Sequence, residues 1–455
     1  MPKRINGEEQ PYIPFGIFKI RLPFVHYKFE MPEFWQGLLL CATCLGAIPI
    51  MTDVFGLSFE VALTMVIING VLYNLHVLLG DPVVPGWITP AIPLTLAYLR
   101  QFEMGPQRVQ AMIALQLLIG ILFIIMGSSG LAKKIINWVP NSIKAGILLG
   151  AGVAAVTGEM SVTGRFNSFP IAIGFGTLLT FYLLFAPQFK SLKKSSTILG
   201  KIGKFGMVPA MIFALIIGVI VKELPAPVIQ WEIFFPRFGE MFSQVSPFSV
   251  GFPTLDMFMA ALPMVAVCYI IAFGDFITSS ALINEADDVR KDEVIDFNSN
   301  RSNLISGVRN IVLALVSPYP TMAGPLWAAV TAALSERYKE GREQMDSIFG
   351  GFGTFRIATM IGVALMPIVS LLRPVLPVAL SLTLLVQGFV CTRLAMQLAD
   401  TNEEKGIAGV MGAVLAIRGA AWGLGVGLIL HFILGNMKKK QVEKIEEEEL
   451  ETVNS

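Results

Sequence analysis

The sequence predicts an all-α integral membrane protein with fourteen transmembrane segments, arranged as two inverted repeats of seven. Composition carries the first part of this prediction. Of 455 residues, 54% are hydrophobic and 15% are charged, and 32 are Phe, which is far from the average of soluble proteins. Apolar runs of about 20 residues recur along the chain, and this is the length that a helix needs to cross a bilayer.

Two of the fourteen apolar runs are too short to cross the ~30 Å hydrocarbon layer as ideal helices, because an α-helix rises about 1.5 Å per residue. These are the third and the tenth, at 86–99 and 321–335. The full set of expected spans is 34–52, 58–79, 86–99, 109–128, 140–157, 169–187, 206–221, 256–281, 303–316, 321–335, 351–371, 375–398, 406–417 and 420–435.

The distribution of Lys and Arg predicts how the chain is oriented in the membrane. Most Lys and Arg fall in connections that share one side of the membrane, including Lys190, Lys201 and Lys204 in a single connection. Such connections are usually cytoplasmic. Residues 1–30 lack the apolar stretch and cleavage site of a signal peptide. We therefore expect a multi-pass plasma (inner) membrane protein with both termini cytoplasmic, an N-terminal segment at 1–30 and a tail at 437–455.

The inverted repeat is predicted from a long connection near the middle of the chain and from the number of spans on each side of it. Residues 222–255 are rich in Pro, Phe and Trp and are expected to form short amphipathic helices at the membrane interface. They separate seven spans in 31–235 from seven in 236–436. An odd number of spans per half makes the halves face opposite ways, which is the signature of an inverted repeat.

The two short spans match each other in this repeat. The third begins at Pro85-Gly86-Trp87, and the tenth follows Tyr319-Pro320 and contains Gly324-Pro325. A broken helix frees backbone groups that lipid cannot satisfy, so a break persists only where protein, water or substrate satisfies them. Half-helix N-termini also carry partial positive charge. Such a pair is the best sequence indicator of a transporter's central binding site.

Among the polar residues of the spans, Asp275 is the main functional candidate, because ionisable groups in apolar runs usually mark substrate, proton or sodium pathways. Asp53 closes the first span, where it either takes part in coupling or is simply solvated. Arg309 either counters an anion or an acid, or extends to the interface from a span end. His76 is expected to be buried and hydrogen-bonded, and Glu159 is expected in a loop.

Aromatic residues cluster around the two breaks. Trp87, Phe273, Tyr319 and Trp327 could stack on a planar heterocycle. Trp and Tyr also anchor helices at membrane interfaces, so this signal has a purely structural alternative.

Other function classes lack sequence support. The chain contains no P-loop, GxSxG or HExxH motif, so an enzyme or an ATP-driven pump is not predicted. A net charge of +1 gives no indication of nucleic-acid binding. The four cysteines lie in apolar runs, where zinc or disulfide chemistry is rare. We expect no metal and no cofactor, with H⁺ or Na⁺ as the coupling ion.

Several stretches resemble the superfamily of nucleobase-ascorbate transporters, SulP-type sulfate and anion transporters, and bicarbonate exchangers. They are MPEFWQGLLLCATCLGAIPIMTDVFGLSFEVAL, GLAKKIINWVPNSIKAGILLGAGVAA, FGDFITSSALINEADD and SNLISGVRNIVLALVSPYPTMAGPLWAAV. The resemblance implies a core domain of spans 1–4 and 8–11 that holds substrate, and a gate domain of spans 5–7 and 12–14. It also implies a homodimer formed through the gate domain. Short extended segments would lie at 84–88 and 319–323, before half helices.

This sequence departs from both main branches. Nucleobase transporters place an acid or polar group early in span 10, where this chain has Met322, Ala323 and Gly324. Sulfate-type members resemble YPxxGSxSR there, and this chain has Tyr319, Pro320 and Gly324 without the serine or the arginine. The resemblance therefore implies a separate branch.

The predicted function is secondary transport of a small planar or anionic solute by alternating access, coupled to protons or sodium. Asp275 is the predicted coupling or substrate-contacting acid, with Asp53 as a second coupling candidate. The alternatives are a SulP-like anion exchanger or facilitator and, from another class, an ion channel. The expected substrate site comprises Trp87, Ile88, Thr89, Phe273, Asp275, Tyr319, Thr321, Met322, Ala323 and Gly324.

Overall fold

The computed structural model describes residues 5–132, 134, 138–196, 199 and 207–435. The tail expected at 437–455 lies outside the described residues, as do the first four residues of the N-terminal segment and Lys201 and Lys204.

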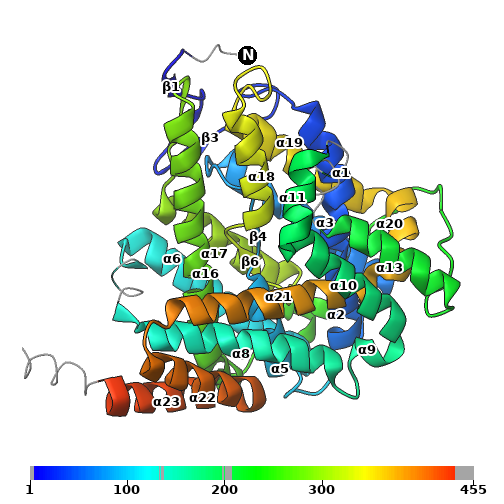
Figure 1. Ribbon diagram of the computed structural model, residues 1–455, viewed down its shortest axis with the longest axis vertical. Coiled ribbons are helices and arrows are strands. Elements are labelled where there is room, and N and C mark those ends of the chain that lie inside the picture. The colour runs from blue at the N-terminus through cyan, green and yellow to red at the C-terminus, as the bar shows by residue number, and fades with distance from the viewer. Residues whose placement is uncertain (1–4, 133, 135–137, 197–198, 200–206, 436–455) are drawn as a thin grey trace, which may run out of the picture.

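Helices dominate the first half of the chain (Figure 1). They are α1 (Met31–Leu45), α2 (Ala47–Phe55), α3 (Phe59–Tyr73), α4 (Leu75–Leu78), α5 (Ile92–Leu99), α6 (Pro106–Ser129), α8 (Asn141–Met160), α9 (Arg165–Ser168), α10 (Pro170–Phe185), α11 (Pro187–Ser195) and α13 (Val208–Ile220), with a 3₁₀ turn η1 (Thr89–Ala91) before α5.

The second half has the same character. Its helices are α14 (Phe238–Val245), α15 (Pro247–Val250), α16 (Leu255–Val289), α17 (Ser299–Val316), α18 (Ala328–Lys339), α19 (Ile348–Ala364), α20 (Met366–Leu372), η2 (Arg373–Val375), α21 (Leu376–Leu398), α22 (Asn402–Arg418) and α23 (Ala420–Leu430), followed by a π-helical turn at His431–Gly435. The short helices α14 and α15 lie in the segment where interfacial helices were expected.

Helix ends follow local sequence signals. The Ser58 side chain accepts a hydrogen bond from the Val61 N–H and caps α3. Thr401 and Glu404 form a capping box at the start of α22, in which each side chain satisfies a backbone N–H that the helix leaves unpaired. Proline stands in the first turn of α5, α6 and α21, where its missing N–H is not needed.

Six helical segments of the described chain are long and apolar enough to cross a membrane: Met31–Phe55, Phe59–Leu78, Pro106–Ser129, Asn141–Ser168, Leu255–Val289 and Met366–Leu398. Helical residues also occupy the other expected spans, although these helices are shorter. The structure therefore describes a multi-pass helical membrane protein. How many segments cross the bilayer stays a prediction.

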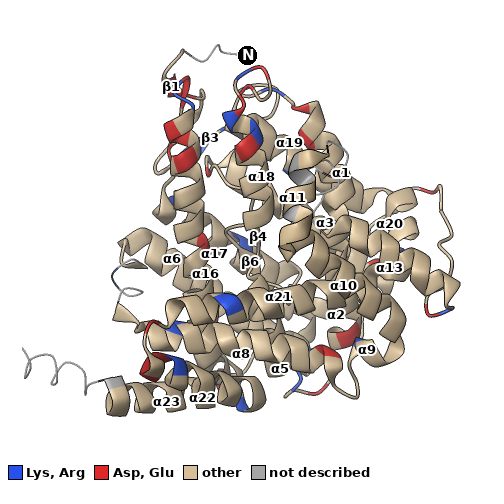
Figure 2. Ribbon diagram, viewed as in Figure 1, with Lys and Arg blue, Asp and Glu red and all other residues tan. Residues whose placement is uncertain are grey.

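The outer surfaces of several helices are apolar. Leu178 on α10, Ile216 and Ile220 on α13, and Trp422 on α23 are all more than half exposed. Charged residues gather at the upper end of the molecule, around β1, α16 and α18, and a smaller number lie at the lower end, around α9 and α22 (Figure 2). Large apolar patches of this kind mark contact with lipid or protein, as expected for helices in a bilayer.

The N-terminal segment packs on one end of the helices. Its strand β1 (Glu8–Glu9) pairs in parallel with β5 (Glu293–Val294), and β2 (Ile13–Phe15) forms a hairpin with β3 (Phe18–Ile20). Arg21 is 1% exposed and forms an ion pair with Glu9. Burial lowers the pKa of Arg21 to about 10, against the opposing effect of Glu9. The segment is thus anchored to the connection between α16 and α17.

Candidate functional site

Two short strands pair near the centre of the molecule (Figure 1). Strand β4 (Gly86–Trp87) is antiparallel to β6 (Ala323–Gly324), with Gly86 opposite Gly324. Strand β4 leads through η1 into α5, and β6 leads through Trp327 into α18. Because the strands are antiparallel and each precedes a helix, the N-termini of both helices lie near the strand pair. Both ends contribute partial positive charge there.

Side chains of α17 hydrogen-bond to the backbone of both residues of β6. The Asn310 side-chain N–H donates to the Ala323 carbonyl at 2.8 Å, and its oxygen accepts from the Ala323 N–H at 2.9 Å. Arg309 donates to the Gly324 carbonyl at 3.1 Å. Helix α17 thus supplies the hydrogen bonds that a third strand would make. The backbone groups freed here are held by protein and do not require a solute.

Glycine is required where the strands meet. A Cβ on Gly324 would lie 2.5 Å from the Trp87 carbonyl oxygen, and a Cβ on Gly86 would lie 2.6 Å from the Leu326 carbonyl oxygen. Just before β6, Met322 adopts a left-handed backbone with φ of 52°. For a residue other than glycine, that conformation is uncommon and is held only by strong surroundings, often at functional sites.

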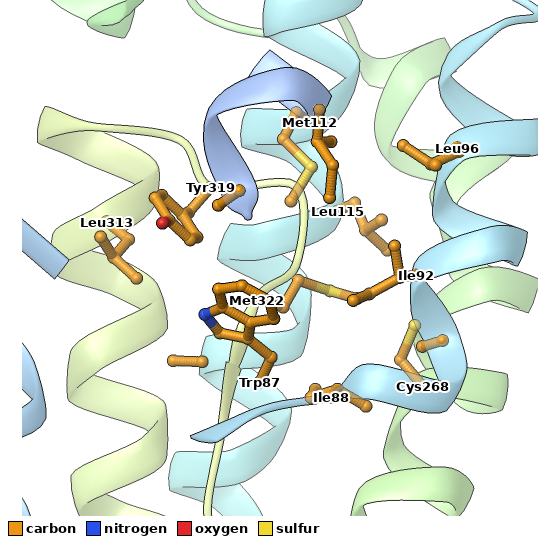
Figure 3. Packing of buried hydrophobic residues seen from close by; sticks show 14 of the residues in the cluster. Trp87, Ile88, Ile92, Leu96, Met112, Leu115, Cys268, Leu313, Tyr319 and Met322 are labelled. Atoms are coloured by element: carbon orange, nitrogen blue, oxygen red, sulfur yellow. The ribbon is translucent and has the colours of Figure 1, made fainter. Parts of the chain in front are cut away.

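Most predicted site residues lie together around the strand pair. Figure 3 shows Trp87, Ile88, Met322 and Tyr319 among the apolar side chains of Ile92, Leu115 and Cys268. Tyr319, Thr321, Met322 and Ile88 are fully buried, and Trp87 is 8% exposed. Ala323 and Gly324 form β6, and Thr89 is half-buried at the start of η1.

Three donors beside the strands have no partner among the described residues. They are the Trp87 indole Nε1–H and the hydroxyl groups of Tyr319 and Thr321. A buried polar group without a partner costs about 1–3 kcal/mol, and in native structures it calls for an explanation. These donors are available to a bound solute that accepts hydrogen bonds.

No hydrogen bond joins the predicted acids to these donors in the described part of the chain. Phe273 is buried on α16, while Asp275, two residues later, is half-buried and has no hydrogen bond or ion pair to a described residue. Asp275 lies near enough to Cys391 of α21 to interact with it electrostatically. Asp53 is exposed at the end of α2 and forms an ion pair with Arg165 at 2.9 Å. The structure does not bring the two acids together.

Glu159 was expected in a loop, and this expectation is wrong. It lies in the last turn of α8 and is 3% exposed. Its carboxylate pairs with Arg165 at 2.5 Å and accepts a hydrogen bond from Ser381 on α21. Glu159, Arg165 and Arg100 line a cavity of about 210 Å³ between α5, α8 and α21. Helix α8 continues because Glu159 finds a cation and a hydroxyl, which removes the cost of burying its charge.

A buried polar cluster lies beside β6, and only part of it was anticipated. His76 is buried as expected, with Nδ1 2.7 Å from Asp81 Oδ2. Its Nε2 lies 3.1 Å from Nη1 of Arg309, which is also fully buried and therefore does not extend to an interface. Arg356 of α19 was not singled out. An arginine inside the apolar run of α19 is the signal that could have identified it.

Comparisons with known proteins show the fold. No family model matches the chain, and no curated protein matches it. Among solved structures, the transmembrane domain of the cyanobacterium bicarbonate transporter BicA aligns with a TM-score of 0.53 and 13% identity, covering 87% of this chain and 96% of that one. The murine Slc26a9 anion transporter, in its inward-facing state, aligns with a TM-score of 0.50 and 13% identity, covering 90% and 69%.

These likenesses show that the chain shares its fold with the transmembrane domain of a bicarbonate transporter and with an anion transporter of the Solute Carrier 26 family. They agree with the anion-transporter part of the resemblance drawn from the sequence and leave its nucleobase-ascorbate part unsupported. At this level of identity the likeness concerns the fold alone.

Proposed function

We propose that the protein is a secondary transporter that moves a small anion across the membrane by alternating access. The observation that carries the proposal is the strand pair, where two helix N-termini converge beside the unpartnered donors of Trp87, Tyr319 and Thr321. Hydrogen-bond donors and positive helix ends both favour a negatively charged ligand. The fold shared with an anion transporter and a bicarbonate transporter supports the same class.

This proposal favours the anion exchanger or facilitator over a carrier of planar heterocycles. A stacking site needs an accessible aromatic face. Tyr319 is fully buried and Trp87 nearly so, and both pack within a cluster of apolar side chains. Neighbouring side chains therefore cover both ring faces.

Alternating access is proposed to occur between two parts of the chain. The core would comprise α1–α6 and α16–α20, and the gate would comprise α8–α13 and α21–α23, with dimers forming through the gate. Helix α5 of the core contacts α8, and η1 contacts both α8 and α21. The helical segment that follows strand β4 therefore lies at the boundary between core and gate. A ligand bound by the core at the strand pair would be close to this boundary when the core moves.

Asp275 is proposed as the coupling group, with H⁺ or Na⁺ as the ion. It lies on α16 of the core, near Cys391 of the gate helix α21, and no described cation neutralises it. An acid without a partner at this boundary can take up a cation in one state and release it in the other.

Uptake by purified protein in liposomes tests the proposed function. Labelled chloride, bicarbonate and sulfate are compared with uracil, each over a range of concentrations. The proposal expects saturable uptake of at least one anion and no saturable uptake of uracil. Saturable uptake of uracil alone would restore the nucleobase-like alternative, and a conductance that does not saturate would indicate a channel.

A further inference from the structure

Two arginines beside the strand pair share one aromatic ring. Arg309 of α17 and Arg356 of α19 are both fully buried. The Cζ atom of Arg309 lies 4.8 Å from the centre of the Tyr73 ring, and that of Arg356 lies 4.1 Å from the same centre. Guanidinium groups attract the face of an aromatic ring, but a ring carries no net charge and does not replace a counter-ion.

Most of the hydrogen-bonding capacity of these arginines is unused. Nη1 of Arg309 contacts the Gly324 carbonyl and His76, while its Nε and Nη2 have no partner. In Arg356, none of Nε, Nη1 and Nη2 has an oxygen or nitrogen partner among the described residues, and the Cys44 sulfur beside them is only a weak acceptor. The neighbours of Arg356 are the ring faces of Tyr73, Trp327 and Phe355, and the Cys44 thiol.

The cluster carries excess positive charge. Of the described side chains bonded to it, only Asp81 is a carboxylate, and it is bound through His76. His76 accepts from Arg309 at Nε2, so its proton lies on Nδ1, facing Asp81, and the ring is neutral; this assignment follows from the hydrogen-bond network. Two guanidinium groups, which stay protonated in proteins, therefore face one carboxylate.

Burying a charge without a counter-ion costs several kcal/mol. We propose that Arg356 and Arg309 form a second, buried anion site, distinct from the donors beside the strands, that holds one small monovalent anion. The anion sits against the free edge of the Arg356 guanidinium and accepts hydrogen bonds from the nitrogens that lack partners. It neutralises the one positive charge that Asp81 leaves.

The charge of the site and the aromatic rings around it determine which kind of anion it binds. One excess charge calls for a monovalent ion. Tyr73, Trp327 and Phe355 offer ring surfaces in place of water, so an ion that gives up its hydration shell easily is favoured over sulfate or phosphate. Both arginines are fully buried, so the ion has to fit within the packed interior, which favours a small ion of the size of a halide. Chloride and bromide are therefore the probes of choice.

The proposed site is connected to the strand pair through Arg309, which also holds the Gly324 carbonyl. An anion that fixes the two arginines thereby stabilises β6. The site goes beyond the proposed transport function, because its occupancy is measured at equilibrium and requires no flux.

Thermal unfolding of the purified protein gives the first test. Sodium bromide replaces sodium gluconate at constant ionic strength, so that only specific binding changes the melting temperature. A ligand that binds only the folded state raises this temperature with saturation, and we expect a saturable rise of a few degrees. In Arg356→Gln the rise should be lost. Arg342→Gln, which removes the same charge from a residue that is 47% exposed, should retain it.

Bromide placed by anomalous scattering gives the second test, and it needs no variant. We expect a peak beside the Arg356 guanidinium of the wild-type protein. A rise in melting temperature that persists in Arg356→Gln, or a peak at the strand pair alone, would overturn the second site while leaving anion transport intact. Absence of anion flux, together with a peak at Arg356, would instead overturn the proposed transport function alone.

Discussion

Asp275 is the residue on which the proposed coupling depends. It is the half-buried acid of α16 for which the structure shows no hydrogen bond or ion pair to a described residue. Removing its charge removes the group that would bind the coupling ion, while leaving the strand pair and its donors in place. Coupling and binding can therefore be separated at this single position.

In Asp275→Asn, uptake driven by a pH or sodium gradient should be abolished, whereas exchange of the same anion should remain. Gradient-driven uptake and exchange are measured in the same liposomes. Asp256→Asn is the matched control, because Asp256 is exposed in the first turn of the same helix; it should retain gradient-driven uptake. Coupled uptake that is unchanged in Asp275→Asn would remove Asp275 from the mechanism.

Adding a single Cβ atom at Gly324 tests whether strands β4 and β6 are in close contact. A Cβ there would lie 2.5 Å from the Trp87 backbone, so the strands must separate in Gly324→Ala. We expect a loss of about 1–3 kcal/mol in the free energy of unfolding, the usual cost of overpacking, and loss of transport. Both are read from denaturation and flux measurements.

The control for this substitution is Gly274→Ala on α16. A Cβ at Gly274 has nothing within 4 Å, and alanine favours a helix over glycine by about 1 kcal/mol. This variant should therefore be neutral or slightly more stable. If Gly324→Ala behaves in the same way, the close contact between β4 and β6 does not exist in the protein.

At the scale of elements, the two strands are as important as the helices that follow them. Strand β6 depends on α17, because Asn310 donates to and accepts from the backbone of Ala323. The pairing thus depends on a third element, α17, as well as on the two strands. A defect in α17 should appear as a defect in the binding site.

Replacing Asn310 by Ala leaves both backbone groups of Ala323 without this buried partner. An unsatisfied buried group costs about 1–3 kcal/mol, so the free energy of unfolding should fall by several kcal/mol in Asn310→Ala, with weaker anion uptake. Asn310→Asp retains the acceptor for the Ala323 N–H and should destabilise the protein less through that group. Equal unfolding free energies for wild type and Asn310→Ala would contradict this function of α17.

The N-terminal segment gives a pH prediction at the same scale. Burial tends to raise the pKa of Asp296, but Lys19 and Arg301 outweigh it and lower the pKa below the ordinary value. A lowered folded-state pKa stabilises the protein above the unfolded pKa of about 3.9, and this contribution is lost as the pH falls through the folded pKa.

Asp296→Asn should therefore lower stability at pH 5 to 8 and have progressively less effect below about pH 4. Thermal unfolding of both proteins across this range measures the difference. A difference that instead grows as the pH falls would contradict the assigned direction of the shift.

The sequence predicted the two helix breaks because their signals are local, whereas the extended segments were implied by the resemblance and the pairing of β4 with β6 was not predicted. Pro85 and Gly86, and Gly324 with Pro325, each form a cluster of helix-disfavouring residues in a short apolar run, and the two clusters occupy matching positions in the expected repeat. The environments of Arg356 and Glu159 depend on contacts with distant helices: Arg356 meets Tyr73 of α3, and Glu159 meets Ser381 of α21. No spacing along the chain encodes those contacts, so these environments could not be predicted.

For the whole molecule, the ion pair between Asp53 of α2 and Arg165 of α9 links the proposed core to the proposed gate. Arg165 also pairs with Glu159, beside the cavity between α5, α8 and α21. The contact must separate if the core moves away from the gate at this end. It therefore biases the protein towards the conformation seen here.

Asp53→Ala should shift the protein towards the conformation that is open at this end. An exposed ion pair contributes about 0.2–1 kcal/mol, so the shift in population should be at most a few-fold. The rate of thiol labelling at Ala154→Cys, which lines the cavity, measures it, and this rate should rise in the Asp53→Ala background. An unchanged rate would show that the ion pair does not hold the two parts together.

The central claim, carrier-mediated transport of a small anion, is tested most directly by counterflow. Liposomes containing the protein and loaded with unlabelled anion are diluted into a trace of the labelled anion, without any ion gradient other than that of the substrate. We predict that the label accumulates transiently above its equilibrium level and that Gly324→Ala abolishes the accumulation. Label that only approaches equilibrium, at a rate proportional to its concentration and equal in Gly324→Ala, would contradict the account.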